Sequence, residues 1–205
     1  MLLGRHGFRL FTDYDLYAGL EAMLTRLQKD IESDSKVTTQ PEEEYVLAKV
    51  KEATIKPLTL FTDRITVSQR EAEIPGRYFP SGFWVEAHES YPKPVFTFHL
   101  PFDGNEQFLR MKPSTFIMWT DEVAVQNGEI EFEVINFSDD VNAIQKGRDE
   151  FLSHLQGQIG NINKDIDSYN SKLETIVRNS LKKAKEKFST QADILSKLGN
   201  PPKID

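Results

Sequence analysis

The clearest pattern in the chain is an apolar stripe toward its C-terminal end. Apolar or aromatic residues recur there at alternating steps of four and three, a spacing typical of a helix that buries one stripe against another helix. Proline is absent from residues 139–198, so nothing in this stretch forces a helix to end. We therefore predict a long helical arm over residues 139–205. The seam of this arm consists of Leu155, Ile159, Ile162, Ile166, Tyr169, Leu173 and Ile176.

Periodicity leaves two forms of this arm open. Gly157 and Gly160 weaken a helix, and Tyr169, Asn170 and Ser171 form a poor helix interior. A break near Asn170 would fold the arm into a hairpin, whereas one unbroken helix would need a partner chain to cover its seam. Because the seam continues past Asn170 on nearly the same stripe, we favour self-association, as in a coiled coil.

Replacing Ile162 and Ile166 by aspartate should cost at least several kcal/mol, because two charges would then lie in an apolar seam. Asn163 and Asp167 lie off the seam. Substitutions there should change the free energy of unfolding by about half a kcal/mol at most.

Two shorter amphipathic patterns occupy residues 1–56. In the first, leucines and isoleucines mark one face from Leu16 to Ile31. Pro41 opens the second, and the three glutamates that follow it complement a helix N-terminus. A polar loop separates the two patterns, so we predict an N-terminal helical hairpin.

Residues 57–138 change to strand-like patterns rich in β-branched and aromatic residues. Asn127-Gly128 predicts a tight hairpin turn. After it, apolar residues alternate with Glu129, Glu131 and Glu133, which predicts a strand with one buried and one solvent-exposed face. An antiparallel sheet of about five strands follows, and with it an α+β fold. The predicted strands are 58–67, 83–88, 95–100, 122–126 and 129–135.

Composition narrows the classes of protein further. The chain of 205 residues contains no cysteine, which excludes disulfides, thiolate nucleophiles and cysteine-ligated metals. Absence of cysteine suits a reducing compartment, so we expect a cytoplasmic protein. No stretch is apolar enough for a membrane span, so we expect no membrane partner. The net charge of −7 argues against a protein that coats nucleic acid along its whole surface.

Positive charge gathers near the end of the arm. Residues 139–205 carry eleven Lys or Arg and ten Asp or Glu, whereas residues 1–138 carry fourteen and twenty-two. The basic cluster consists of Arg178, Lys182, Lys183, Lys185 and Lys187. This cluster has two interpretations: a solvent-exposed face near a helix C-terminus, or a surface that binds phosphate or an acidic partner. We favour the first because no base-stacking aromatic pattern accompanies it, which makes nucleic acid a less favoured partner.

Candidate chemistry is sparse. His6, His88, His99 and His154 stand singly, without the spacing of metal ligands, and we predict structural or surface roles for them. Carboxylate pairs such as Glu71 and Glu73 lack the further acid and lysine of a nuclease motif, and glycine-rich phosphate loops are absent. Arg5-His6-Gly7 matches histidine phosphatases but lacks the strand that precedes it there. The sequence therefore predicts no catalytic residue, cofactor or metal.

Several motifs follow one another in a familiar order. They are Pro101-Phe102-Asp103-Gly104, Lys112-Pro113-Ser114-Thr115, the Asn-Gly hairpin, the helical arm and Leu195-Ser196-Lys197-Leu198-Gly199-Asn200-Pro201. This order resembles an uncharacterised bacterial module found ahead of TIR-type or restriction-endonuclease-type effector domains in candidate phage-defence proteins. The resemblance covers residues 74–201 and carries no catalytic residues over to this chain.

These observations predict three segments: a helical hairpin over 1–56, an antiparallel β domain over 57–138 and the arm over 139–205. We predict a non-enzymatic sensing, scaffold or adaptor component of an anti-phage defence system. It would assemble with itself or with an effector protein through the arm. Two alternatives stay open: a metal-dependent nuclease or hydrolase with dispersed carboxylates, and a nucleic-acid adaptor that uses the basic end of the arm.

Overall fold

A computed structural model describes residues 7–198 of the chain and confirms the α+β class. His6, the Arg5-His6-Gly7 motif and the stretch from Gly199 to Pro201 fall wholly or partly outside the described residues. The helices are α1 (Leu16–Ser33), α2 (Glu42–Ala53) and α3 (Val141–Leu198). The strands are β1 (Phe8–Arg9), β2 (Tyr14–Asp15), β3 (Thr59–Leu60), β4 (Thr66–Pro75), β5 (Ser90–Asp103), β6 (Met111–Lys112), β7 (Glu122–Gln126) and β8 (Glu129–Ile135).

The chain divides into two compact units. The sheet unit comprises Met1–Leu16 and Pro57–Lys164, and the helical unit comprises Tyr17–Lys56 and Asp165–Asp205. This grouping differs from the three consecutive segments that the sequence suggested. The difference arises because α3 contributes its first part to the sheet unit and its second part to the helical unit.

An antiparallel sheet in the order β1-β7-β8-β5-β3 forms the sheet unit, with β4 also paired to β5. The Asn-Gly turn is confirmed, since Asn127 and Gly128 both adopt positive φ between β7 and β8. Phe132 on β8 stacks between Phe98 on β5 and Phe151 on α3, with ring centroids 5.2 and 3.8 Å apart. The first part of α3 thereby covers one face of the sheet.

Two strand predictions are wrong. The segment 83–88 forms a loop, and β5 instead begins at Ser90 and runs through Pro92 and Pro94. Prolines are tolerated there because β8 pairs only with Val95 to Pro101, which leaves that side of β5 without a second ladder. The segment 58–67 is not one strand either, since a short 3₁₀ turn, Thr62–Arg64, separates β3 from β4.

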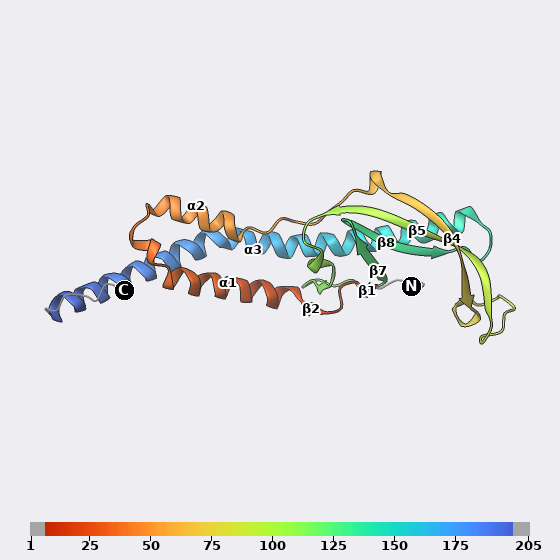
Figure 1. Cartoon of the computed structure of the whole chain (residues 1–205), viewed down its shortest axis with the longest axis horizontal. Coiled ribbons are helices and arrows are strands. Elements are labelled where there is room, and N and C mark those ends of the chain that lie inside the picture. The colour runs from red at the N-terminus through yellow and green to blue at the C-terminus, as the bar shows by residue number, and fades with distance from the viewer. Residues whose placement is uncertain (1–6, 199–205) are drawn as a thin grey trace. The chain divides into compact units, whose positions relative to one another are not determined.

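The predicted N-terminal hairpin is confirmed: α1 and α2 are joined through a 3₁₀ turn, Ser35–Thr38. Asp34 caps this turn by accepting from Lys36 N at 2.9 Å and from the Tyr45 hydroxyl at 3.0 Å. In the helical unit both helices pack along the later part of α3 (Figure 1). Their common core consists of Ile31, Val37, Tyr45, Val46, Val177, Leu181 and Ala184.

Helix α3 is continuous over 58 residues, so the hairpin form of the arm is wrong. Asn170 lies inside the helix without a break. Gly157 lies close to Ile117, since a Cβ there would lie 2.9 Å from Cδ1, the flexible end of that side chain. None of the helices within residues 7–198 has the length and apolar character needed to cross a bilayer.

Candidate interaction surface on α3

The seam predicted on α3 is largely a buried stripe. Leu155, Ile159, Ile162, Ile166, Tyr169 and Leu173 are all buried. Ile176, the last member, is half-buried, and the stripe passes instead through Val177 to Leu181 and Ala184. After Leu173 the buried residues are four positions apart, at Val177 and Leu181. An α-helix has 3.6 residues per turn, so positions that repeat every 3.5 residues gradually move around the helix. This drift explains why Val177 is buried in place of Ile176.

The chain itself covers this stripe. In the helical unit, Val177, Leu181 and Ala184 pack in the core built with α1 and α2. In the sheet unit, Phe151 stacks on Phe132. The premise that an unbroken helix needs a partner chain is therefore wrong. The predicted seam residues could form an interface with another chain only if the elements that cover them within each unit moved away.

Three amide side chains next to the stripe bind backbone in a reciprocal way. Asn163 accepts from Leu58 N at 2.9 Å and donates to Leu58 O at 2.8 Å. Asn170 does the same with Ile55, at 3.0 and 2.8 Å. Gln158 accepts from Ile117 N at 3.3 Å and donates to Ile117 O at 2.8 Å. Each amide supplies one donor and one acceptor, as a neighbouring β-strand would.

For this reason we revise the expectation for Asn163 and now predict that its substitution is costly. Leu58 is buried and precedes β3, so its N–H and C=O lack strand partners and depend on the Asn163 amide. Leaving buried backbone groups without partners costs about 1–3 kcal/mol. The sequence offered one clue: Asn163 and Asn170 lie a heptad apart, beside the seam.

Two members of the basic cluster form ion pairs within the helical unit. The Arg178 guanidinium makes two parallel bonds to Glu43 at 2.7 and 2.8 Å and a third to Glu174 at 2.9 Å. Lys185 binds Glu42 at 2.8 Å. The hydrogen bonds from Arg178 hold the pKa of the Glu43 carboxyl below its usual range. This face of α3 therefore already binds carboxylates, those of the first turn of α2.

Lys182, Lys183 and Lys187 are exposed. In the described part of the chain no ion pair involves any of the three. Their charge is thus available at the surface, next to the pairs that Arg178 and Lys185 make.

Beyond Ala184 the apolar stripe continues but loses its cover. Phe188 packs on the edge of the core, and Ala192 and Leu195 follow at steps of four and three. Leu195 is 50% exposed and its neighbour Ile194 is 54% exposed. Helix α3 extends past the turn between α1 and α2 (Figure 1). We call Phe188, Ala192 and Leu195 the distal stripe.

A groove lies at the base of the distal stripe. It is open to solvent, has a volume of about 380 Å³ and is lined by Val37, Thr38, Gln40, Lys185, Phe188, Ser189 and Ala192. The 3₁₀ turn between α1 and α2 supplies one wall and α3 supplies the other. Sequence reasoning missed this surface, although the steps from Phe188 to Leu195 repeat those of the seam.

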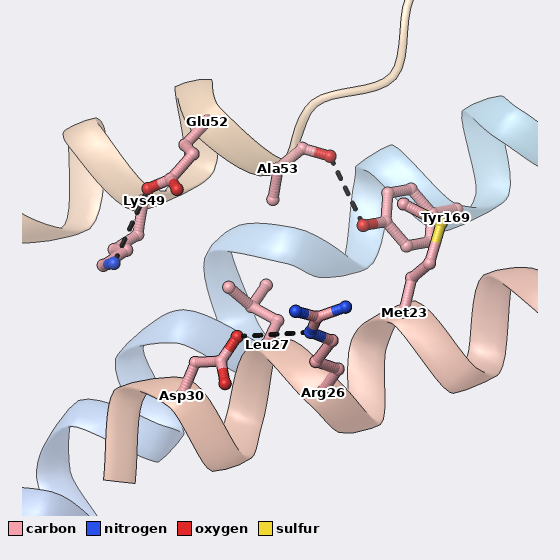
Figure 2. A pocket seen from close by; sticks show the side chains of 8 residues that line it. All are labelled: Met23, Arg26, Leu27, Asp30, Lys49, Glu52, Ala53 and Tyr169. Atoms are coloured by element: carbon pink, nitrogen blue, oxygen red, sulfur yellow. Dashed lines mark hydrogen bonds and ion pairs between the residues drawn. The ribbon is translucent and has the colours of Figure 1, made fainter. Parts of the chain in front are cut away.

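A second, smaller hollow lies between the three helices of the helical unit (Figure 2). It has a volume of about 240 Å³, an apolar floor and a rim of paired charges. The Tyr169 hydroxyl donates to the Ala53 carbonyl at 3.3 Å, and burial raises the pKa of this phenol. Arg26 pairs with Asp30 at 3.8 Å and Lys49 with Glu52 at 3.5 Å. Pockets that bind drug-sized ligands measure roughly 300–1,000 Å³, so we interpret this smaller hollow as a packing gap.

The sheet face away from α3 is not the wet face that alternation predicted. Glu131 is buried, and the Glu133 carboxylate is inaccessible and pairs with Arg70 at 3.0 Å. The register explains this arrangement, since Glu131 lies opposite His99 on β5. Long side chains of β4 and β5 therefore cover the carboxylates of β8.

His99 lies in a chain of contacts across this face. Its Nε2 atom is 2.9 Å from the Ser68 hydroxyl and its Nδ1 atom is 3.1 Å from the Glu131 carboxylate. Serine, histidine and acid in this order can activate a hydroxyl. A serine nucleophile also needs donors aimed at the oxyanion, and Ser68 lies within the exposed β4 ladder rather than at a strand-to-helix turn. We interpret these contacts as a hydrogen-bond network that gives the buried Glu131 carboxylate a partner.

The other histidines stand apart from this network. His154 is exposed and stacks on Trp119, with ring centroids 5.2 Å apart, and His88 lies in the loop before β5. Within residues 7–198, no three His, Asp or Glu side chains are placed to hold a metal ion. Comparisons of the chain with protein-family models, with curated proteins and with solved structures find no match.

Proposed function

We propose that this protein is a non-enzymatic scaffold or adaptor that binds another protein through the end of α3. The observation that carries the proposal is the distal stripe. A stripe that forms core as far as Ala184 continues through Phe188 to Ala192 and Leu195 at the surface, beside a groove. Exposed apolar residues that form a contiguous surface beside a groove are typical of protein interaction sites.

The proposal revises where assembly takes place. Seam residues such as Ile162 and Ile166 are core, so the partner would contact the part of α3 that α1 and α2 do not reach. The motif order shared with modules ahead of effector domains supports an effector as the partner and anti-phage defence as the setting. Plaque counts on cells with and without the gene and its neighbours test that setting.

Co-purification from the native host tests the proposed function. Leu195→Asp places a charge in the distal stripe, and Leu47→Asp is the matched control because Leu47 is a 69% exposed leucine on α2. We expect the wild type and Leu47→Asp to recover the same protein in a fixed ratio, and Leu195→Asp to lose it. Equal recovery with all three would contradict the proposed function.

A further inference from the structure

We infer that the distal stripe and its groove bind an amphipathic helix of another protein whose apolar stripe is flanked by carboxylates. This inference rests on the proposed function and adds the chemistry of the partner. Three observations support it: the shape of the site, its charge, and the carboxylates that the same helix already binds.

The shape suits a helix laid along α3. Phe188, Ala192 and Leu195 follow one another at steps of four and three, so they form one line along the helix. A partner helix that repeats apolar residues at the same spacing would match this line. Small Ala192 leaves room for a large partner residue, and the groove between Val37 and Phe188 offers a second position for one.

The charge selects an acidic partner. Residues 182–198 carry five lysines against one glutamate and one aspartate. On a helical wheel Lys185 and Lys187 fall on opposite sides of the distal stripe, since they precede Phe188 by three residues and by one. Carboxylates beside the partner's apolar stripe would therefore meet the exposed Lys187 on one side, as e and g residues do in a coiled coil. On the other side they would meet Lys185, whose ammonium also binds Glu42.

The chain contains an internal precedent for this recognition. Glu42 and Glu43 belong to the first turn of α2, and they bind Lys185 and Arg178 of α3. A helix with acidic residues thus already lies against the basic face of α3, and its contact with Lys185 is one turn before the distal stripe begins. An acidic partner helix would extend the same mode of packing toward Leu195.

A second copy of the chain fits less well. Two distal stripes packed against each other would bring two sets of lysines together, each with an excess of three positive charges. Like charges across an interface cost binding free energy and suppress association. Self-association through this end of α3 is therefore disfavoured, in contrast to association with an acidic helix.

The test uses the full chain and three synthetic helices of about three heptads each. The acidic probe carries leucine at positions a and d and glutamate at e and g. The basic probe replaces those glutamates by lysine, and the polar probe replaces the leucines by serine. Fluorescence anisotropy measures the dissociation constant of each labelled probe for the wild type, Leu195→Asp and Leu47→Asp, and circular dichroism checks that each variant is folded.

We expect the acidic probe to bind at least about tenfold more tightly than either other probe, because charge and apolar contacts both contribute. Leu195→Asp should weaken that binding about tenfold or more, and Leu47→Asp should leave it unchanged. Lys185→Glu combined with Lys187→Glu should reverse the preference toward the basic probe.

Several results would overturn the inference. They are equal binding of the acidic and basic probes, no binding of the acidic probe, or binding that Leu195→Asp leaves intact. A dimer in light scattering that Leu195→Asp dissociates would assign the surface to a second copy. Duplex DNA bound at physiological salt and lost only in Lys182→Glu with Lys183→Glu would assign it to nucleic acid.

The two proposals fail in different ways. If the acidic probe does not bind but a native partner still depends on Leu195, the partner has another chemistry and the proposed function holds. If no native partner depends on Leu195, the proposed function fails whatever the probe does.

Discussion

Two stretches of the same stripe on α3 have opposite surroundings. From Leu155 to Ala184 its members are buried in the two units, whereas from Ala192 onward they face solvent. Spacing and residue type are alike in both stretches, with aliphatic residues at steps of three and four. Periodicity therefore identifies the face of a helix that must be covered, but it does not say what covers it.

The largest effect is expected in the buried stretch. Ile162→Asp with Ile166→Asp should cost at least several kcal/mol of unfolding free energy, because both positions are fully buried. Chemical denaturation followed by circular dichroism measures the loss. The control is Asp167→Asn, an exposed position on the same helix, which should stay within about half a kcal/mol of the wild type. A stable, fully helical double variant would contradict the burial of the stripe.

The amide beside the stripe should matter next. Asn163→Ala removes both bonds to Leu58 and should cost about 1–3 kcal/mol, since the buried backbone groups of Leu58 lose their partners. Asn179→Ala is the matched control, because Asn179 is an exposed asparagine on the same helix. Equal stability of the two variants in urea denaturation would show that water replaces the Asn163 amide.

Much of the fold could be predicted because it depends on local sequence. The extent of α1, the Asn-Gly turn and the apolar face of α3 follow from periodicity and turn chemistry. The roles of Asn163 and Glu131 could not be predicted in this way. Asn163 binds a residue more than a hundred positions earlier, and buried Glu131 contacts His99 of a neighbouring strand.

The site illustrates the same limit. The basic cluster was visible in the sequence, but only the structure shows that Arg178 and Lys185 are paired with Glu43 and Glu42. Charge and periodicity thus locate candidate surfaces, and tertiary packing decides which of them is accessible.

A smaller effect should appear in the dependence of stability on pH. The pKa of Glu43 is lowered in the folded chain by hydrogen bonds from Arg178. The pair therefore stabilises the fold above the ordinary carboxyl pKa of 4.5, and this stabilisation is lost as pH falls through the lowered value. At neutral pH Glu43→Gln should slightly lower the melting temperature, and the difference should vanish in acid. Because the Glu43–Arg178 pair is at the surface, added salt should reduce the difference in melting temperature between Glu43→Gln and the wild type. A difference that persists in acid would point to packing rather than charge.

The smallest effect on stability is expected where the stripe is exposed. Leu195→Asp should change the free energy of unfolding by about half a kcal/mol at most, because Leu195 is 50% exposed in the last turn of α3. Leu181→Asp is the comparison within the same stripe, and it should cost several kcal/mol because Leu181 is buried in the helical core. Urea denaturation of both variants measures the contrast. If Leu195→Asp proved as costly as Leu181→Asp, the distal stripe would already be covered in the isolated protein, by a second copy or by the chain itself. A stable Leu195→Asp that has lost its partner would separate binding from folding along one helix face.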